Sequence, residues 1–372
     1  MRSCNRFLSG LLTVFFLMGP LTGDNFAQET VRPRNVILFI GDGMGLSHVY
    51  AAYTRNKGHL NMMNCPYTGF SITHSSSSYT TDSGAGATAI SCGKKTYNGA
   101  VGVDADSVPC KNIIEYAEDK GMSTGMIATC AITHATPAGF IAHQLNRYCY
   151  EAIATDFLKT DIDLFIGGGA DFFSKRSDSA DLISQLKNKG YEVIMYPSSI
   201  GPFTAPKVAV FTAPQNNPRF SEGRGNMLPD AAEQAINLLS KNDSGFFMMV
   251  EGSQIDWGSH SNDIDYAIEE LIDMDNAVGI ALDFARQSGN TLVIITADHE
   301  TGGLVIIDGN MTEGTMSVRF NTQNHTGIMV PVFAYGPGAE EFTGVYENTA
   351  IFSKLKNLLN LTDPCISITQ SE

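Results

Sequence analysis

Positive charge is scarce in this sequence: 24 Lys and Arg residues stand against 39 Asp and Glu residues, a formal net charge of −15 over 372 residues. A field of this sign repels polyanions, so nucleic acid binding is not expected. A small phosphorylated ligand would need a local source of positive charge, and bound divalent cations can supply one. Because several of the excess carboxylates can serve as ligands for such ions, acidity and metal binding are compatible here.

Long apolar segments are absent after the N-terminal region, so no later segment is expected to span a membrane. Two arginines precede the apolar run 7–18, and a stretch rich in Gly, Pro and polar residues then extends to Ala27. This pattern is typical of a secretory signal peptide. A membrane-spanning helix is the alternative, but the run is short for the ~20 residues that a bilayer requires. We therefore expect cleavage of residues 1–27 and export of residues 28–372 to the periplasm or the medium, without stable membrane association.

Cysteine is also sparse, and its spacing matches no zinc-ribbon pattern. Cys4 falls in the expected signal segment. The remaining cysteines are even in number: Cys65, Cys92, Cys110, Cys130, Cys149 and Cys365. Since export permits disulfide formation, a structural role for these cysteines is favoured.

Short apolar runs recur along the chain, and continuous apolarity is typical of strands buried on both faces of a sheet. The runs are 36–40, 124–129, 164–166, 192–195, 208–211, 246–250, 292–296 and 332–335. Helical patterns lie between them, at 111–120, 180–189, 230–240 and 265–287. This alternation predicts an α/β fold: a single large domain with a mostly parallel central sheet, flanked by helices on both faces.

Candidate ligands follow the predicted strands. Asp42 comes after the first strand, Thr136 after the second, Glu251 directly after the strand 246–250, and Asp298 with His299 after the strand 292–296. In open α/β sheets the carboxyl ends of the strands border one crevice, so these residues can converge around a ligand. One such placement arises easily by chance, whereas four together indicate a site.

The segment Gly41-Asp42-Gly43 has glycines after a strand, as a dinucleotide-binding loop does. A carboxylate in the middle of such a loop would repel a pyrophosphate. The flanking glycines would instead let the backbone bring Asp42 close to a cation, so a metal ligand is favoured.

Ser83 lies in the small-residue stretch 81–89, where a helix is expected to begin. One interpretation is an ordinary N-cap. The other is a nucleophile, because the free amides and the dipole of a helix N-terminus favour both a phosphate and the attacking alkoxide. The pattern alone leaves both interpretations open.

Asp256 and His260 are four residues apart and share one face if their segment is helical. A carboxylate and an imidazole so placed can share a zinc ion, although a surface ion pair has the same spacing. His325 offers a further imidazole, and Arg147 offers a planar fork for phosphate oxygens. Taken singly, each of these last two would be interpreted as a solvated surface residue.

Together these segments resemble the alkaline phosphatases, and they occur in that family's order. The matching motifs are Gly-Asp-Gly at 41–43, Thr-Asp-Ser at 81–83, His-Ala-Thr at 134–136, Glu-Gly-Ser-Gln-Ile-Asp at 251–256, Thr-Ala-Asp-His at 296–299 and His-Thr-Gly at 325–327. The similarity covers nearly the whole mature chain. It implies hydrolysis of small phosphate monoesters to an alcohol and inorganic phosphate through a covalent phosphoserine at Ser83, with Arg147 binding the phosphate.

The resemblance also implies two zinc ions and one magnesium ion. One zinc ion would be held by Asp256, His260 and His325, and the other by Asp42, Asp298 and His299 beside Ser83. The magnesium ion would be held by Asp42, Thr136 and Glu251. His134 and Trp257 stand where some family members have Asp and Lys. His134 would therefore act on the third metal directly or through water, while Trp257 would pack or shape the pocket.

Three further expectations come from the resemblance. The stretch between Gly303 and His325 is short where larger members carry a crown-like subdomain, which implies a compact variant. Cys110 and Cys149 fall near positions that are disulfide-bonded in animal relatives, so a disulfide is expected between them. A homodimer is expected as well.

Two alternatives remain at this point. Within the superfamily, a phosphodiesterase is conceivable, although Ser83 sits where diesterases usually have Thr, and the Cys-x-Pro-x-Arg motif of sulfatases is absent. Outside catalysis, an exported protein that sequesters metal or phosphate would keep the ligands without turnover. The presence of both Ser83 and Arg147 argues against that second alternative.

Overall fold

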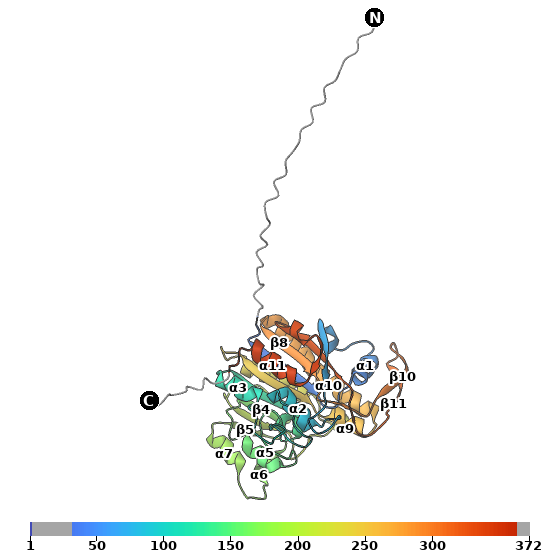
Figure 1. Cartoon of the computed structure of the whole chain (residues 1–372). Coiled ribbons are helices and arrows are strands. Elements are labelled where there is room, and N and C mark those ends of the chain that lie inside the picture. Colours follow the sequence, from blue (N-terminus) through green and yellow to red (C-terminus); the bar gives the residue numbers. More distant parts are fainter. Residues whose placement is uncertain (2–31, 363–372) are drawn as a thin grey trace. The chain divides into compact units, whose positions relative to one another are not determined.

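The computed structural model describes residue 1 and residues 32–362 (Figure 1). The expected signal peptide and Cys365 therefore lie outside the described residues, Met1 excepted. The chain divides into residues 1–30 and a compact unit that begins at Val31, and the fold below is that of the compact unit. Among the helices of the described residues, none has both the length and the apolarity to cross a membrane.

Within the described residues, ten strands form the central sheet. Their order across the sheet is β14 (Gly344–Glu347), β2 (Tyr67–Ile72), β13 (Val330–Tyr335), β8 (Thr291–Thr296), β1 (Asn35–Gly41), β7 (Phe246–Gly252), β3 (Ser123–Ala131), β4 (Leu164–Gly168), β6 (Val208–Phe211) and β5 (Glu192–Met195). β13 pairs antiparallel with both β8 and β2, whereas the other neighbours in this sheet pair in parallel. The predicted mostly parallel sheet is therefore confirmed.

Alternate residues of the central strands enter two separate hydrophobic clusters. In β1, Val36, Leu38 and Ile40 pack into one cluster, while Ile37 and Phe39 pack into the other. Because successive side chains of a strand point to opposite faces, the two clusters lie on the two faces of the sheet. Both faces of β1 are buried, which explains its unbroken apolar sequence.

Helices cover each cluster, as the alternating pattern predicts (Figure 1). One cluster receives buried side chains from α2 (Ser83–Cys92), α3 (Ile113–Asp119), α5 (Tyr150–Asp156), α6 (Ala170–Ser174), α7 (Leu182–Asn188) and α11 (Thr349–Leu358). The other receives them from α1 (Leu46–Arg55), α8 (Met227–Leu239) and α10 (Ile264–Ser288). The prediction of one α/β domain with helices on both faces is confirmed.

The structure differs from the sequence prediction at the sheet margins. The run 192–195 forms β5, but as a partly exposed edge strand rather than a strand buried on both faces. β2 and β14 have mixed exposure and no continuous apolar run, so the apolarity signal misses them. The short stretch after Gly303 forms the hairpin of β10 (Val305–Asn310) and β11 (Thr315–Arg319), in keeping with a compact variant.

The topology places the candidate residues side by side. β8, β1, β7 and β3 are consecutive in the sheet and run in the same direction, so their carboxyl ends meet at one edge. A separate two-stranded pair, β9 (Glu300–Thr301) and β12 (His325–Thr326), then joins the segment after the hairpin to the segment after β8. It brings His325 opposite Thr301 at the same edge.

Candidate active site

Asp42 follows β1 directly and is fully buried. The next residue, Gly43, has φ +73°, and a Cβ there would lie 2.8 Å from the Thr301 hydroxyl and 2.9 Å from the Asp256 backbone. A glycine is therefore favoured at position 43 for two reasons: the backbone is left-handed there, and neighbouring segments approach too closely for a side chain. The glycine-flanked loop thus places the buried Asp42 side chain among neighbouring polar residues.

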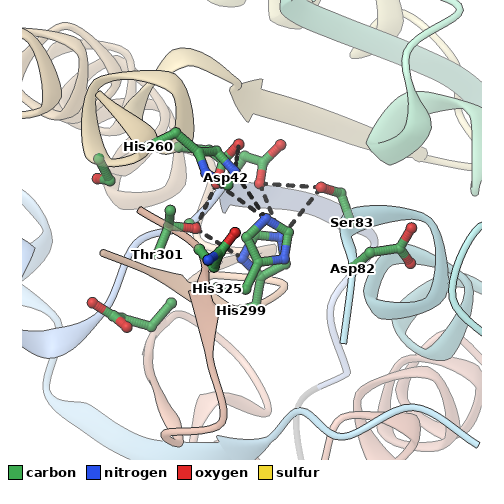
Figure 2. A network of polar contacts seen from close by, with 12 residues as sticks. Asp42, Asp82, Ser83, His260, His299, Thr301 and His325 are labelled. Carbon is green, nitrogen blue, oxygen red and sulfur yellow. Dashed lines mark hydrogen bonds and ion pairs between the residues drawn. The ribbon is translucent and has the colours of Figure 1, made fainter. Parts of the chain in front are cut away.

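Ser83 is the first residue of α2, and Asp82 rather than Ser83 is the N-cap. The Asp82 carboxylate accepts a hydrogen bond from the Ala85 amide at 3.0 Å, which leaves the Ser83 hydroxyl free for other contacts. Ser83 Oγ lies 3.2 Å from His299 Nε2 and 3.4 Å from Asp42 Oδ1 (Figure 2). The hydroxyl therefore stands at a helix N-terminus beside candidate metal ligands.

A first group of candidate ligands contains Asp42, Asp298 and His299, with ligand atoms within 4.8 Å of one another. All three side chains are buried, and the Asp42 Oδ2 and Asp298 Oδ2 atoms have no hydrogen-bond partner within the described part of the chain. Burial, followed by the charge of Asp298, raises the pKa of Asp42 well above its ordinary value. Burial likewise raises the pKa of Asp298 to about 7. Buried carboxylates that each keep one oxygen without a hydrogen bond fit a bound cation, which would supply the missing charge and contacts.

A second group contains Asp256, His299 and His325, again with ligand atoms within 4.8 Å of one another. α9 (Gln254–His260) is helical as predicted, so His260 faces Asp256 with 3.3 Å between Nε2 and Oδ2. His325 Nε2 lies 3.5 Å from Asp256 Oδ1 and 3.1 Å from His260 Nε2 (Figure 2). The structure thus brings together Asp256, His260 and His325, the three residues that were predicted to share one ion, and it places His299 in both groups.

The three histidines share one orientation. Each ring uses Nδ1 to contact an oxygen: His260 contacts the Gln323 carbonyl at 2.5 Å, His325 the Thr81 carbonyl at 2.9 Å, and His299 the Thr301 hydroxyl at 3.3 Å. Nε2 of each ring is left facing the carboxylates. Anchoring of the distal ring nitrogen by an oxygen is the usual arrangement around metal-binding histidine. Burial also lowers the pKa of His299, which favours the neutral imidazole that binds metal.

A third group contains Cys130, His134 and Glu251, with ligand atoms within 4.8 Å of one another. Thr136 belongs to α4 (Ala135–Ala138) and lies close to Glu251. Burial raises the pKa of Glu251 to about 7, although the neighbouring Thr136 acts to lower that pKa. Thr136 Oγ1, Glu251 Oε1 and His134 Nδ1 nevertheless have no hydrogen-bond partner of normal geometry. Burial lowers the pKa of His134 to about 3, so its ring is neutral.

The third group shares His134 and Glu251 with the predicted magnesium site and adds the Cys130 thiol. Glu251 and Thr136 offer oxygen atoms, but a thiol and an imidazole are poor ligands for magnesium. Burial, followed by the charge of Glu251, raises the pKa of the Cys130 thiol well above its ordinary value. Cys130 was interpreted from sequence as structural. It nevertheless directly follows the predicted strand 124–129, so its position beyond a strand end is the signal that could have identified it.

Arg147 lines a pocket beside these candidate ligands, and the volume of this pocket is about 620 Å³. Its Nη1 donates to Asp82 Oδ2 at 2.9 Å, so the residue that caps α2 also holds the guanidinium. Burial acts to lower the pKa of Arg147, but Asp82 raises it overall and the side chain stays charged. Trp257 lines the pocket too, and its ring meets the His134 ring edge-on with 5.9 Å between centroids.

The predicted Cys110–Cys149 disulfide is not formed in this structure, where neither cysteine is paired with another cysteine of residues 32–362. The Cys110 thiol points toward the Val108 carbonyl, 3.6 Å away. Cys149 is exposed and precedes α5 as its N-cap residue.

Comparison with known proteins agrees with the fold. A family model described as alkaline phosphatase matches residues 33–318 and 308–361. Alkaline phosphatase 4 of Bacillus subtilis is 32% identical over 407 residues, covering 87% of this chain and 88% of that protein. Alkaline phosphatase of Escherichia coli is 31% identical over 424 residues, covering 92% and 90%. Among solved structures, alkaline phosphatase from the Antarctic bacterium TAB5 has a TM-score of 0.86 at 44% identity, covering 90% of this chain and 100% of that chain.

Proposed function

Because the chain belongs to the alkaline phosphatase family of metal-dependent phosphomonoester hydrolases, we propose that it hydrolyses phosphate monoesters through a covalent phosphoserine at Ser83. One observation carries the proposal. The Ser83 hydroxyl lies at the N-terminus of α2, 3.2 Å from His299 and 3.4 Å from Asp42, in a pocket that Arg147 also lines. This proximity supports the proposal, because a candidate nucleophile, candidate metal ligands and a guanidinium suited to binding phosphate lie close together.

Two zinc ions are proposed at the paired groups of ligands. One would be held by Asp256, His260 and His325, and the other by Asp42, Asp298 and His299. The support is the donor set of carboxylates and neutral imidazoles, together with the unpartnered atoms Asp42 Oδ2 and Asp298 Oδ2. When bound, such a pair would supply Lewis-acid stabilisation of charge on the entering and leaving oxygens. A third ion is proposed near Glu251 and Thr136.

Arg147 would bind the nonbridging phosphate oxygens. Asp82 occupies its Nη1 and fixes the plane of the guanidinium, while the remaining N–H groups can donate to the substrate. The amides of the first turn of α2 would add further donors on the side of Ser83. Since these contacts engage the phosphoryl group and not the alcohol, many different monoesters are expected to be substrates.

The reaction would proceed in two displacements at phosphorus. In the first, Ser83 Oγ loses its proton and bonds to phosphorus while the ester P–O bond breaks, and the alcohol leaves after it gains a proton. In the second, water attacks the phosphoserine, the Oγ–P bond breaks, and inorganic phosphate is released with Ser83 restored. His299 Nε2 and Asp42 border the Ser83 oxygen throughout and keep it oriented toward the pocket.

Export and a homodimer are also proposed. The support for export is the pattern of residues 1–27 in the sequence. The support for a homodimer is the family resemblance.

A pair of serine variants tests the function. Ser83→Ala should abolish incorporation of phosphate from a labelled monoester while metal content, measured by mass spectrometry, stays near that of the parent. Ser91→Ala is the matched control, because Ser91 is buried in the same helix and donates to the Gly139 carbonyl instead of facing the pocket. Phosphate incorporation by the Ser83→Ala protein would contradict the assignment.

A further inference from the structure

The end of β3 brings a thiol into the third group of ligands. β3 and β7 pair in parallel with Ala128 opposite Glu251, and Cys130 lies two residues farther along β3. The pairing of β3 with β4 shifts register between Ile127 and Ala131, an irregularity of the kind that re-aims side chains. Cys130 Sγ consequently lies 3.4 Å from Glu251 Oε2.

The surroundings of this thiol contain polar atoms that the protein leaves unsatisfied. Glu251 and Thr136 are fully buried, yet among the described residues Glu251 Oε1 and Thr136 Oγ1 have no hydrogen-bond partner of normal geometry, and neither does His134 Nδ1. Buried polar atoms are normally satisfied by protein or by a bound species. Ligand atoms of Cys130, His134 and Glu251 lie within 4.8 Å of one another, and two of these residues, His134 and Glu251, each carry one of the unsatisfied atoms, which points to a ligand there.

The chemistry of the donors narrows the choice of ligand. Magnesium requires oxygen donors in near-octahedral geometry and dehydrates reluctantly. A thiolate with an imidazole and one carboxylate is a donor set for zinc or cobalt, which accept mixed sulfur, nitrogen and oxygen ligands. In that respect the third group also differs from the two neighbouring groups, which contain carboxylates and imidazoles without sulfur.

We propose that Cys130, His134 and Glu251 hold a zinc-type ion through a direct cysteine sulfur–metal bond, in place of the magnesium ion expected from the resemblance. Binding releases the Cys130 proton to solvent, and the ion takes over the contacts missing at Glu251 and His134. The inference rests on the proposed function in placing a third ion beside the catalytic pair. The competing interpretation is a buried thiol that donates to the Ala131 carbonyl, 3.2 Å away, and to Glu251 without touching a metal.

Cobalt substitution separates the two interpretations. The full protein is stripped of metal and reloaded with Co²⁺ alone, and the near-ultraviolet absorption is recorded. Sulfur bonded to cobalt gives an intense charge-transfer band, whereas ligation by nitrogen and oxygen at the paired sites does not. We expect the band in the parent protein, its loss in Cys130→Ser, and its retention in Cys65→Ser, which removes a buried thiol in the other hydrophobic cluster. Absence of the band from the parent, or its persistence in Cys130→Ser, overturns the proposal.

A second measurement follows metal selectivity. After reloading in a mixture of zinc and magnesium, we expect about three zinc ions in the parent, one for each group of ligands, and about two in Cys130→Asp. Since aspartate supplies an oxygen donor in place of sulfur, magnesium should enter the third site of that variant. Equal zinc content in both proteins would count against sulfur ligation. Phosphate incorporation at Ser83 is measured on the same samples, so failure of the catalytic proposal is seen independently of the spectrum.

Discussion

Thr301 offers a quantitative test of how the ligand cluster is held. Its hydroxyl donates to Asp256 Oδ1 at 2.5 Å and lies 3.3 Å from His299 Nδ1, so one side chain orients a ligand in each of the paired groups. Thr301→Val keeps the shape and removes the hydroxyl. A hydrogen bond to a charged group contributes about 1.5–3 kcal/mol. At about 1.4 kcal/mol for each factor of ten, zinc affinity should fall roughly 10–100-fold, the range typical for loss of an outer-shell partner.

The assay is competition for zinc against a chelator of known affinity, monitored by residual protein-bound metal. Thr54→Val is the matched control, since Thr54 is also buried but donates to the Tyr50 carbonyl within α1. The control should keep the parent affinity. If Thr301→Val binds zinc as tightly as the control, the hydroxyl does not orient these ligands and the reasoning fails.

Three other predictions follow from the same geometry. Arg147→Ala should raise KM for small monoesters roughly 10–100-fold, because it removes charge-assisted hydrogen bonds of about 1.5–3 kcal/mol, and steady-state kinetics with an unchanged KM would refute that role. In the metal-free protein, burial raises the pKa of Asp298 from 3.8 to about 7. The folded state then binds more protons than the unfolded state between these values, so the free energy of unfolding should fall as the pH rises through this window. Urea unfolding at about pH 5 and about pH 8 would check this, and zinc loading should remove the dependence. Arg224→Met should destabilise the fold by about 3–5 kcal/mol, because the buried Arg224 donates to Glu270 and Asp273, which would be left as unpaired charges, and chemical denaturation would measure the loss.

The sequence predicted the centre of the fold well because the central strands are buried on both faces. β1 and β8 have unbroken apolar sequences, since no residue in either strand faces water. The margins lack that constraint: β2 mixes exposed and buried residues, and β5 is a partly exposed edge. The direction of β13 could not be predicted either, because an apolar run has the same composition whether the strand runs parallel or antiparallel.

The spatial arrangement of the candidate site was predictable where candidate ligands lie at a fixed offset from a strand end or on one helix face. Asp42 and Asp298 are examples of the first, and Asp256 with His260 of the second. Thr301 could not be identified as an orienting residue, since its role depends on how the segment after β8 folds back over Asp256. The sequence predicted a structural role for Cys130. Its approach to Glu251, beside the register shift of β3 against β4, is seen only in the structure.

The two paired groups differ in their access to water. Asp42, Asp298 and His299 are wholly enclosed, whereas the side chain of His260 is 38% exposed and that of His325 is 17% exposed. His325 moreover belongs to β12, a strand of only two residues that follows the hairpin of β10 and β11. With ions bound as proposed, an ion in the outer group would leave past the partly exposed His260 and His325, whereas an ion in the inner group would be held by side chains that are all buried. Loss of zinc to a dilute chelator should accordingly proceed in two stages. The protein that has lost only the outer ion would remain folded and able to bind zinc again.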